Sequence, residues 1–143
     1  LEQPLAADDL TGHADLRGLG PPVALDESLA EYRPRTIIDH EAADVFVLEP
    51  MVLGGPDIAR AMAELVRRRG YTPVLGTTFD SVVARTGAIH VAASLPNLAP
   101  SGLATASYLQ EDLAPDPTTV TEGFVHVPDS PGLGIPEVAI PDA

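Results

Sequence analysis

The stretches "LEQPLAADD" (residues 1–9) and "ALDES" (residues 24–28) decide the fold, because each carries an acid directly after an apolar segment. Glu2 and Asp26 lie 24 positions apart, a spacing that suits one β-strand with its following helix. Adjacent parallel strands run about 4.8 Å apart, so equivalent strand ends could bring the two carboxylates around one hard cation such as Mg²⁺. The alternative is that Glu2 is a cap or surface residue and that Asp26 caps the next helix.

Strand-like and helix-like segments alternate along the rest of the chain. We predict strands at residues 1–4, 23–26, 44–50 and 72–78, and helices at residues 8–19, 35–43, 54–70, 81–95 and 105–109. The clearest helix follows Pro56 and carries an apolar stripe, made by Ile58, Met62, Leu65 and Val66. The last 25 residues are predicted as strand and turn. This alternation is typical of an α/β fold with a parallel sheet.

Polar side chains recur where the predicted strands end, at Glu2, Asp26, Glu49 and Thr77. Active sites of (β/α)8 barrels are built from these carboxyl ends, and open doubly wound sheets also bind ligands there. A whole barrel takes about 250 residues. The 143 residues supply only about half of the βα units, and we therefore expect part of a (β/α)8 TIM-type barrel.

The charge of the chain excludes several classes of partner. Asp and Glu number 21 against 8 basic residues, all of them Arg, which gives a formal net charge of −13. Such a surface repels nucleic acid and anionic membranes, and no apolar run is long enough to span a membrane. It indicates either a salt-adapted, halophilic protein or an ordinary acidic protein of the cytoplasm. With no Lys and no Cys, these residues provide neither a Lys base nor thiolate ligands.

"LEQPL", "ALDES" and "VPDSPGLGI" resemble the barrel domain of the enolase superfamily, in its muconate-cycloisomerase-like branch. The resemblance covers nearly the whole chain and implies that residues 1–143 are a partial C-terminal barrel domain, starting at the end of about the fourth strand. It also implies a Mg²⁺ site in which Glu2 and Asp26 are the second and third of three acids. The first acid and a Lys-x-Lys motif are expected upstream.

Within this branch, "LEPMVLGG", "LGTTFDSVVARTGAIHVAA" and "PSGLATASYLQEDL" most resemble the o-succinylbenzoate synthase family. That resemblance implies a lyase of menaquinone biosynthesis, which dehydrates a small carboxylate substrate through an enediolate stabilised by Mg²⁺. It places the succinyl tail of the substrate near Thr77, Thr78 and the backbone of Gly102. From the residues alone, the two Thr side chains also fit ordinary strand propensity, and Gly102 also fits a turn.

Other outcomes stay open within and outside this branch. N-succinylamino acid racemase, dipeptide epimerase and muconate cycloisomerase would share the barrel and the metal site. A non-catalytic chain is the third possibility, since half a barrel leaves an open sheet edge and has no proton-transfer Lys. We expect no turnover from these 143 residues alone.

Glu49 departs from the family pattern, because the family has a Lys at the end of this strand. A cation that faces the substrate has become an anion, which would protonate, join the metal or weaken the binding of an anionic substrate. The four His residues lie in helical or terminal segments, and none is predicted to pair with an Asp. This argues against the mandelate-racemase-like branch, which needs a His–Asp pair.

Overall fold

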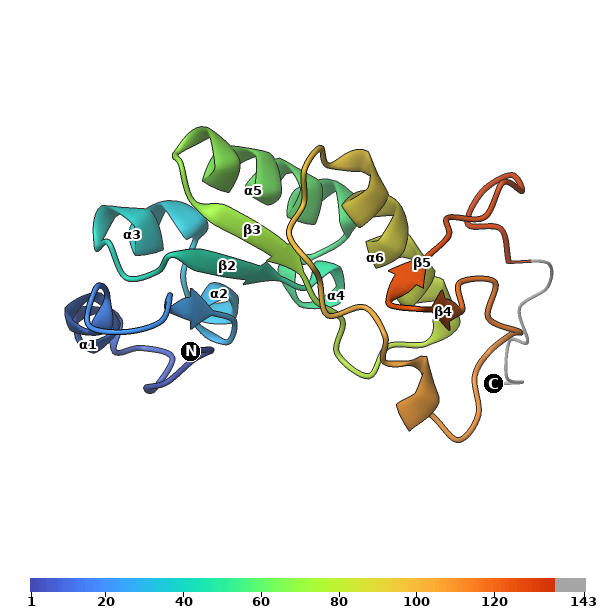
Figure 1. The fold of residues 1–143 in the computed structure, drawn as a ribbon, viewed down its shortest axis with the longest axis horizontal. Helices are drawn as coiled ribbons and strands as arrows, with labels where there is room; N and C mark the ends of the chain where they lie inside the picture. Colours follow the sequence, from blue (N-terminus) through green and yellow to red (C-terminus); the bar gives the residue numbers. More distant parts are fainter. Residues whose placement is uncertain (136–143) are drawn as a thin grey trace.

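The computed structural model describes residues 1–135 as a short parallel sheet with helices packed against it (Figure 1). The elements in chain order are α1 (Leu10–Leu16), β1 (Ala24–Leu25), α2 (Ser28–Glu31), α3 (Pro34–Asp39), β2 (Val45–Leu48), α4 (Pro50–Leu53), α5 (Pro56–Arg68), β3 (Thr72–Leu75), α6 (Val82–Ser94), a 3₁₀ turn η1 (Ala106–Tyr108), β4 (Val120–Thr121) and β5 (Phe124–Val125).

The main sheet has the order β1-β2-β3 and is parallel throughout. Two isolated parallel bridges extend it on both sides, Glu2 with Ala24 and Gly76 with Gly102. Five successive chain segments therefore lie side by side in sequence order, joined by helical crossovers. This arrangement is the wall of a (β/α) barrel, and the predicted α/β fold with parallel strands is confirmed.

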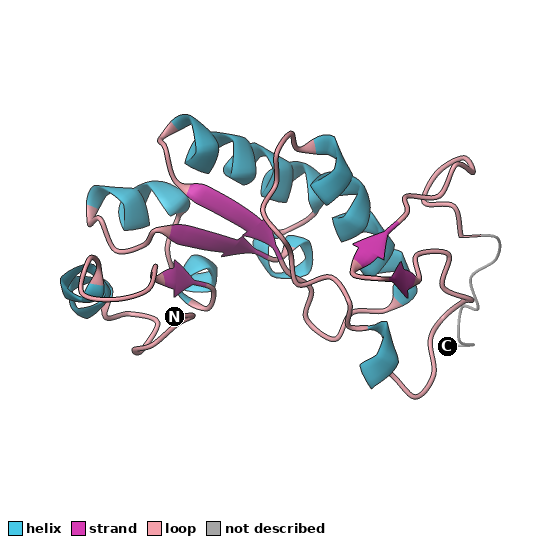
Figure 2. Cartoon of the chain, viewed as in Figure 1, coloured by secondary structure: helices cyan, strands magenta, loops and turns pink. Residues whose placement is uncertain are grey.

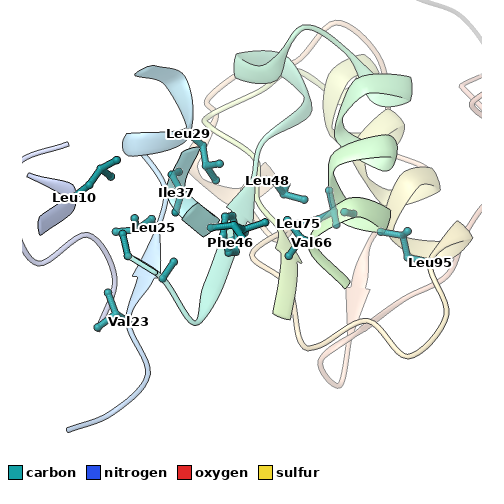
Figure 3. Close-up of a cluster of buried hydrophobic side chains, with 14 of the residues drawn as sticks. Leu10, Val23, Leu25, Leu29, Ile37, Phe46, Leu48, Val66, Leu75 and Leu95 are labelled. Carbon is teal, nitrogen blue, oxygen red and sulfur yellow. The ribbon is translucent and has the colours of Figure 1, made fainter. Parts of the chain in front are cut away.

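One face of the sheet carries the hydrophobic core. Side chains alternate between the two faces of a strand. Leu25, Phe46, Leu48 and Leu75 lie on the helix-facing side and are fully buried (Figure 3). Burial of each such side chain stabilises the fold by about 1.5–3 kcal/mol. The core therefore fixes which strand residues face the opposite, barrel-interior side.

Helix α5 lies along the sheet (Figure 2). It covers the core with small residues. Ala59, Ala63 and Val66 are its buried positions, while Ile58, which we predicted in the apolar stripe, is 44% exposed. The helix approaches the sheet along its alanine face, because small side chains allow a closer approach than Ile. Met62 packs at the margin of the core, so the predicted stripe is displaced by about one residue.

Most predicted elements exist but are shorter than expected, while the strand predicted at residues 1–4 is a single bridge at Glu2 and the helix predicted at residues 105–109 is the 3₁₀ turn η1. The helix predicted at residues 8–19 is α1, Leu10–Leu16, capped by the carboxylate of Asp9, which accepts a hydrogen bond from the Gly12 amide at 2.8 Å. The prediction also missed α2 and α4, because four residues are too few to show a helical period. Of the last 25 residues, β4 and β5 form an antiparallel hairpin, and residues 136–143 lie outside the described part of the chain.

The segment after α6 is held by one buried guanidinium. Arg85 is 1% exposed and contacts Asp112 at 2.9 Å, Asp116 at 3.0 Å and the carbonyl oxygen of Asp80 at 2.8 Å. The other carboxylate oxygen of Asp112 accepts from the Val82 amide at 2.7 Å, at the first turn of α6. These bonds fasten an otherwise irregular segment to the end of β3 and the start of α6.

Candidate functional site

Three acids lie at the carboxyl ends of consecutive strands. Glu2 pairs with Ala24, and Ala24 pairs with Val45. Because paired residues of parallel strands point to the same side and every second residue shares a face, Asp26 and Glu49 belong to the face of Glu2. This face is opposite to the one that packs on the helices. The site therefore opens toward the interior of the barrel, at the edge where barrel active sites are found.

Asp26 is the half-buried member of the predicted metal-ligand pair. Burial raises the pKa of Asp26 to about 6, and the Glu27 and Glu2 carboxylates add to this rise. Glu2 pairs with Ala24, two residues before Asp26, so the two predicted ligands are neighbours at this edge. Negative charge confined in this way favours a proton or a cation between the carboxylates.

The structure does not support the alternative in which Asp26 caps the following helix. Helix α2 has Glu27 at its N-cap, and no side chain there accepts a capping hydrogen bond. Asp26 contributes its backbone, since its carbonyl oxygen accepts from the Leu29 amide at 2.8 Å. Its carboxylate therefore does not cap this helix. Glu2 is an exposed side chain at the same edge.

Glu49 lies beside this pair, at the end of β2. Burial raises the pKa of Glu49 to about 7, with further contributions from Asp26, Asp80, Glu27 and Glu2. Gly76 on the next strand makes room for it, because a Cβ at position 76 would lie 3.1 Å from Cγ of Glu49. The position at which the resemblance implies a Lys is thus filled by a carboxyl group whose raised pKa favours partial protonation near neutral pH.

Thr77 and Gly102 belong to two segments that are hydrogen-bonded to each other. The Thr77 hydroxyl lies 3.0 Å from that of Thr105 and 3.4 Å from the carbonyl oxygen of Gly102. The Gly102 amide donates to the Leu75 carbonyl at 2.9 Å, so Gly102 extends the sheet and does not make a turn. Of the Gly102 backbone, only the carbonyl oxygen can accept a further hydrogen bond.

Thr78 is exposed and directs its hydroxyl to Asp80. The hydroxyl donates to the Asp80 carboxylate at 2.5 Å, and Asp80 is itself 9% exposed. The prediction missed Asp80, although it follows "GTTF" at a strand end. The exposed Phe79 lies between them, with its ring 5.7 Å from that of Tyr108. This loop presents polar and aromatic groups at the same edge of the sheet.

The residues present fit a divalent cation as part of a metal site. Within residues 1–135, no three His, Asp or Glu side chains gather closely enough to enclose an ion. Glu2 and Asp26 supply two oxygen donors of the kind that Mg²⁺ accepts, and their mutual repulsion would be relieved by its charge. The third acid that the resemblance implies stays a prediction.

The barrel wall and its acidic edge define a class of protein, and comparison with known proteins gives the same class. Residues 1–137 match the family described as "Enolase C-terminal domain-like". The chain therefore belongs to the enolase C-terminal domain-like family. The predicted resemblance to the enolase superfamily is confirmed.

Among curated relatives, N-succinylamino acid racemase of Thermus thermophilus is 34% identical over 139 residues, covering 94% of this chain and 37% of the relative. The o-succinylbenzoate synthase of Geobacillus stearothermophilus is 33% identical, covering 94% of this chain and 36% of the relative. The chain thus spans little more than a third of the length of these relatives. Both are enzymes by name, and they carry different activities.

Solved structures show the same relationship. The N-succinyl Arg/Lys racemase of Bacillus cereus superposes with a TM-score of 0.86 at 30% identity, covering 96% of this chain and 37% of that structure. Muconate cycloisomerase of Pseudomonas fluorescens gives a TM-score of 0.88 at 26% identity, covering 96% and 39%. The predicted branch of the superfamily is confirmed by these neighbours.

No described helix has the length and apolarity needed to cross a membrane.

Proposed function

We propose that this chain supplies two Mg²⁺ ligands, Glu2 and Asp26, to the active site of a Mg²⁺-dependent dehydratase like o-succinylbenzoate synthase. The complete protein would remove a proton α to the carboxylate of a small-molecule substrate, giving an enediolate, and would then expel a β-hydroxyl group. The pathway served would be menaquinone biosynthesis. The observation that carries the proposal is the convergence of Glu2, Asp26 and Glu49 on one face at the carboxyl edge of the sheet.

Each residue of this chain has a distinct part in the proposed reaction. Bound Mg²⁺ would supply the positive charge that stabilises negative charge developing on the substrate carboxylate. Glu2 and Asp26 would hold it from neighbouring strands. Thr78 would offer its backbone amide to the distal part of the substrate, because its hydroxyl proton goes to Asp80, while Thr77 would keep the Gly102 segment in place. The proton-abstracting base is expected outside these residues, since the chain has no Lys.

Glu49 would set the protonation state of the site. A protonated Glu49 can donate a hydrogen bond to substrate oxygen, whereas an ionised one repels a carboxylate. We therefore expect binding of an anionic substrate to weaken as the pH rises through about 7, the pKa of Glu49.

A racemase is the second candidate, and specific relatives favour it. Two N-succinylamino acid racemases are 34% and 31% identical to the chain, similar to the 33% of the synthase. Racemisation would use the same metal ligands and the same α-proton removal, but would return a proton without loss of hydroxyl. The two functions therefore differ in the substrate contacts and not in the part of the metal site described above.

The test is an assay of the complete gene product with Mg²⁺ and with EDTA. We expect Mg²⁺-dependent dehydration of a succinyl-bearing β-hydroxy acid, lost in Glu2→Gln and Asp26→Asn and kept in the exposed control Glu122→Gln. Racemisation of N-succinylamino acids without dehydration would select the second candidate. Full activity in EDTA would contradict the metal role of both acids.

A second assay addresses Glu49. Glu49→Lys in the complete gene product restores the positive charge of the family pattern at the end of β2. We expect it to raise kcat and to remove the loss of substrate binding near pH 7. Unchanged kinetics would show that this position has little influence on turnover.

A further inference from the structure

A hydrogen-bonded network lies directly behind the two proposed metal ligands. It is centred on Gln3, the residue after Glu2, and reaches the backbone that follows Asp26. The Gln3 side-chain oxygen accepts from the amide of Asp26 at 3.0 Å and from that of Ser28 at 3.3 Å. One side chain thus joins the ends of two strands that are 23 residues apart in sequence.

The orientation of the Gln3 amide follows from its partners. Ser28 is fully buried, and its hydroxyl donates its only proton to the Ala7 carbonyl at 2.7 Å. The Ser28 oxygen must therefore accept from the Gln3 amide nitrogen, which lies 2.9 Å away. That contact turns the Gln3 oxygen toward the two backbone amides, as they require. All these bonds are mutually consistent in a single arrangement.

A buried histidine supports the same segment. His13 is fully buried, and its Nε2 accepts from the Leu5 amide at 3.3 Å. Its Nδ1 therefore carries the proton and donates to the Asp9 carbonyl at 2.8 Å. The segment after Gln3 is thus anchored at both ends, which limits the positions that the Gln3 backbone can take.

The backbone of Gln3 is itself unusual. Its φ of +36° lies in the left-handed region, which non-glycine residues adopt at a cost. A residue holds such a conformation when its surroundings determine it fully. Here the amide of Gln3 donates to the Ala24 carbonyl at 2.8 Å while the side chain turns to Asp26 and Ser28. Strand pairing and side-chain network together fix the residue next to Glu2.

We infer that Gln3 is a positioning residue. Its side-chain amide, hydrogen-bonded to Ser28, fixes the spacing between the Glu2 and Asp26 carboxylates. The effect on metal binding rests on the proposed function of Glu2 and Asp26. Gln3 contributes no ligand. It acts through the backbone of Asp26 on one side and through its own bond to Glu2 on the other. Loss of the amide would leave both acids present but free to move apart.

The test uses Mn²⁺ as probe and the complete gene product. Gln3→Met removes the side-chain amide at similar length, and Ser28→Ala removes only the hydroxyl that accepts a hydrogen bond from this amide. Gln110→Met, at an exposed glutamine, is the matched control. We expect the Mn²⁺ dissociation constant, measured by electron paramagnetic resonance, to rise about tenfold in Gln3→Met, less in Ser28→Ala, and not at all in the control.

Amide hydrogen exchange, measured by NMR without metal, separates the inference from the proposed function. Faster exchange at Asp26 and Ser28 in Gln3→Met, with the rest of the chain unchanged, supports the network. If wild type binds Mn²⁺ and Gln3→Met binds it equally well, the positioning role is wrong and the metal site stands. If wild type binds no Mn²⁺, the proposed metal site is wrong, and unchanged exchange at Asp26 and Ser28 would overturn the positioning role as well.

Discussion

Glu49 shows how one side chain can change the chemistry of a strand end. A Lys at this position would offset the charge of Glu2 and Asp26, whereas Glu49 adds to it. Partial burial, and then the surrounding carboxylates, raise its pKa and favour its protonated form. A protonated acid is neutral and can donate one hydrogen bond, so the position retains a donor while it loses the positive charge.

The pH dependence of stability should reveal this protonation. Since the pKa of Glu49 is raised to about 7 in the folded chain, the native state binds this proton more tightly than the unfolded state does. The stabilising contribution is complete below about pH 4.5 and is lost as the pH rises through 7. We expect Glu49→Gln to melt higher than wild type by about 3 °C at pH 8, after allowance for solvent screening.

At pH 4.5 the two proteins should melt together, because the wild-type carboxyl is protonated there. Melting curves by circular dichroism at both pH values provide the measurement. Glu122→Gln, at an exposed turn position, is the control. A difference between wild type and Glu49→Gln that stays constant from pH 4.5 to 8 would contradict the assignment.

Gly76 tests whether space for Glu49 is built into the neighbouring strand. A Cβ at position 76 would lie 3.1 Å from Cγ of Glu49 and 3.2 Å from Cγ1 of Val47. We expect Gly76→Ala to destabilise the chain by about 1–3 kcal/mol, and by less in a Glu49→Ala background. Denaturant unfolding of the two single variants and the double variant measures the coupling.

Gly87→Ala is a useful comparison, because its Cβ would meet nothing closer than 3.8 Å inside helix α6. There the substitution should stabilise by about 0.5–1 kcal/mol. Equal costs for Gly76→Ala with and without Glu49 would show that the glycine serves another purpose.

At the scale of the elements, the segment from Asp112 to Thr118 depends on ion pairing more than on regular structure. Hydrogen bonds from the Val82 amide and from Arg85 lower the pKa of Asp112, and those from the Thr118 hydroxyl and amide and from Arg85 lower the pKa of Asp116. Sequence periodicity could not find this contact, because the partners of Arg85 are 27 and 31 positions away in an irregular segment. Arg85 lies within a largely apolar helix, so its ion pairs were not predicted.

Asp112→Asn should therefore loosen both α6 and the segment that follows it. It removes one of the two carboxylates that pair with a buried guanidinium, and we expect a loss of about 2 kcal/mol, or roughly 6 °C in melting temperature. Limited proteolysis should cleave the variant within residues 109–118 faster than wild type. Asp129→Asn, an exposed position, should leave both readouts unchanged, and equal cleavage of Asp112→Asn and wild type would contradict the role of the ion pair.

At the scale of the whole molecule, the charge of −13 dominates. Self-repulsion of this size destabilises a compact chain at low ionic strength and is screened by salt. We expect the melting temperature to rise steadily between about 0.05 and 2 M KCl if the protein is salt-adapted. Sorbitol at matched water activity separates screening from solvent exclusion, and a flat response to KCl would favour an ordinary acidic protein.

The sequence by itself determined the class of fold and the candidate positions. Apolar strands at regular spacing require a parallel sheet with helical crossovers, and acids placed after them fall at one edge, because both properties depend on local periodicity. The short helices α2 and α4 escaped prediction for the same reason, although Pro50 and Gly54 mark the ends of one of them.

Only the tertiary structure decided how these positions act. The strand register placed Glu2, Asp26 and Glu49 on the face opposite the core, and burial raised the pKa of the latter two. It also revealed the roles of Gln3 and Arg85, whose partners are distant in sequence. Burial, electrostatic coupling and long-range hydrogen bonds arise when separate segments pack together, and no local pattern of residues encodes them.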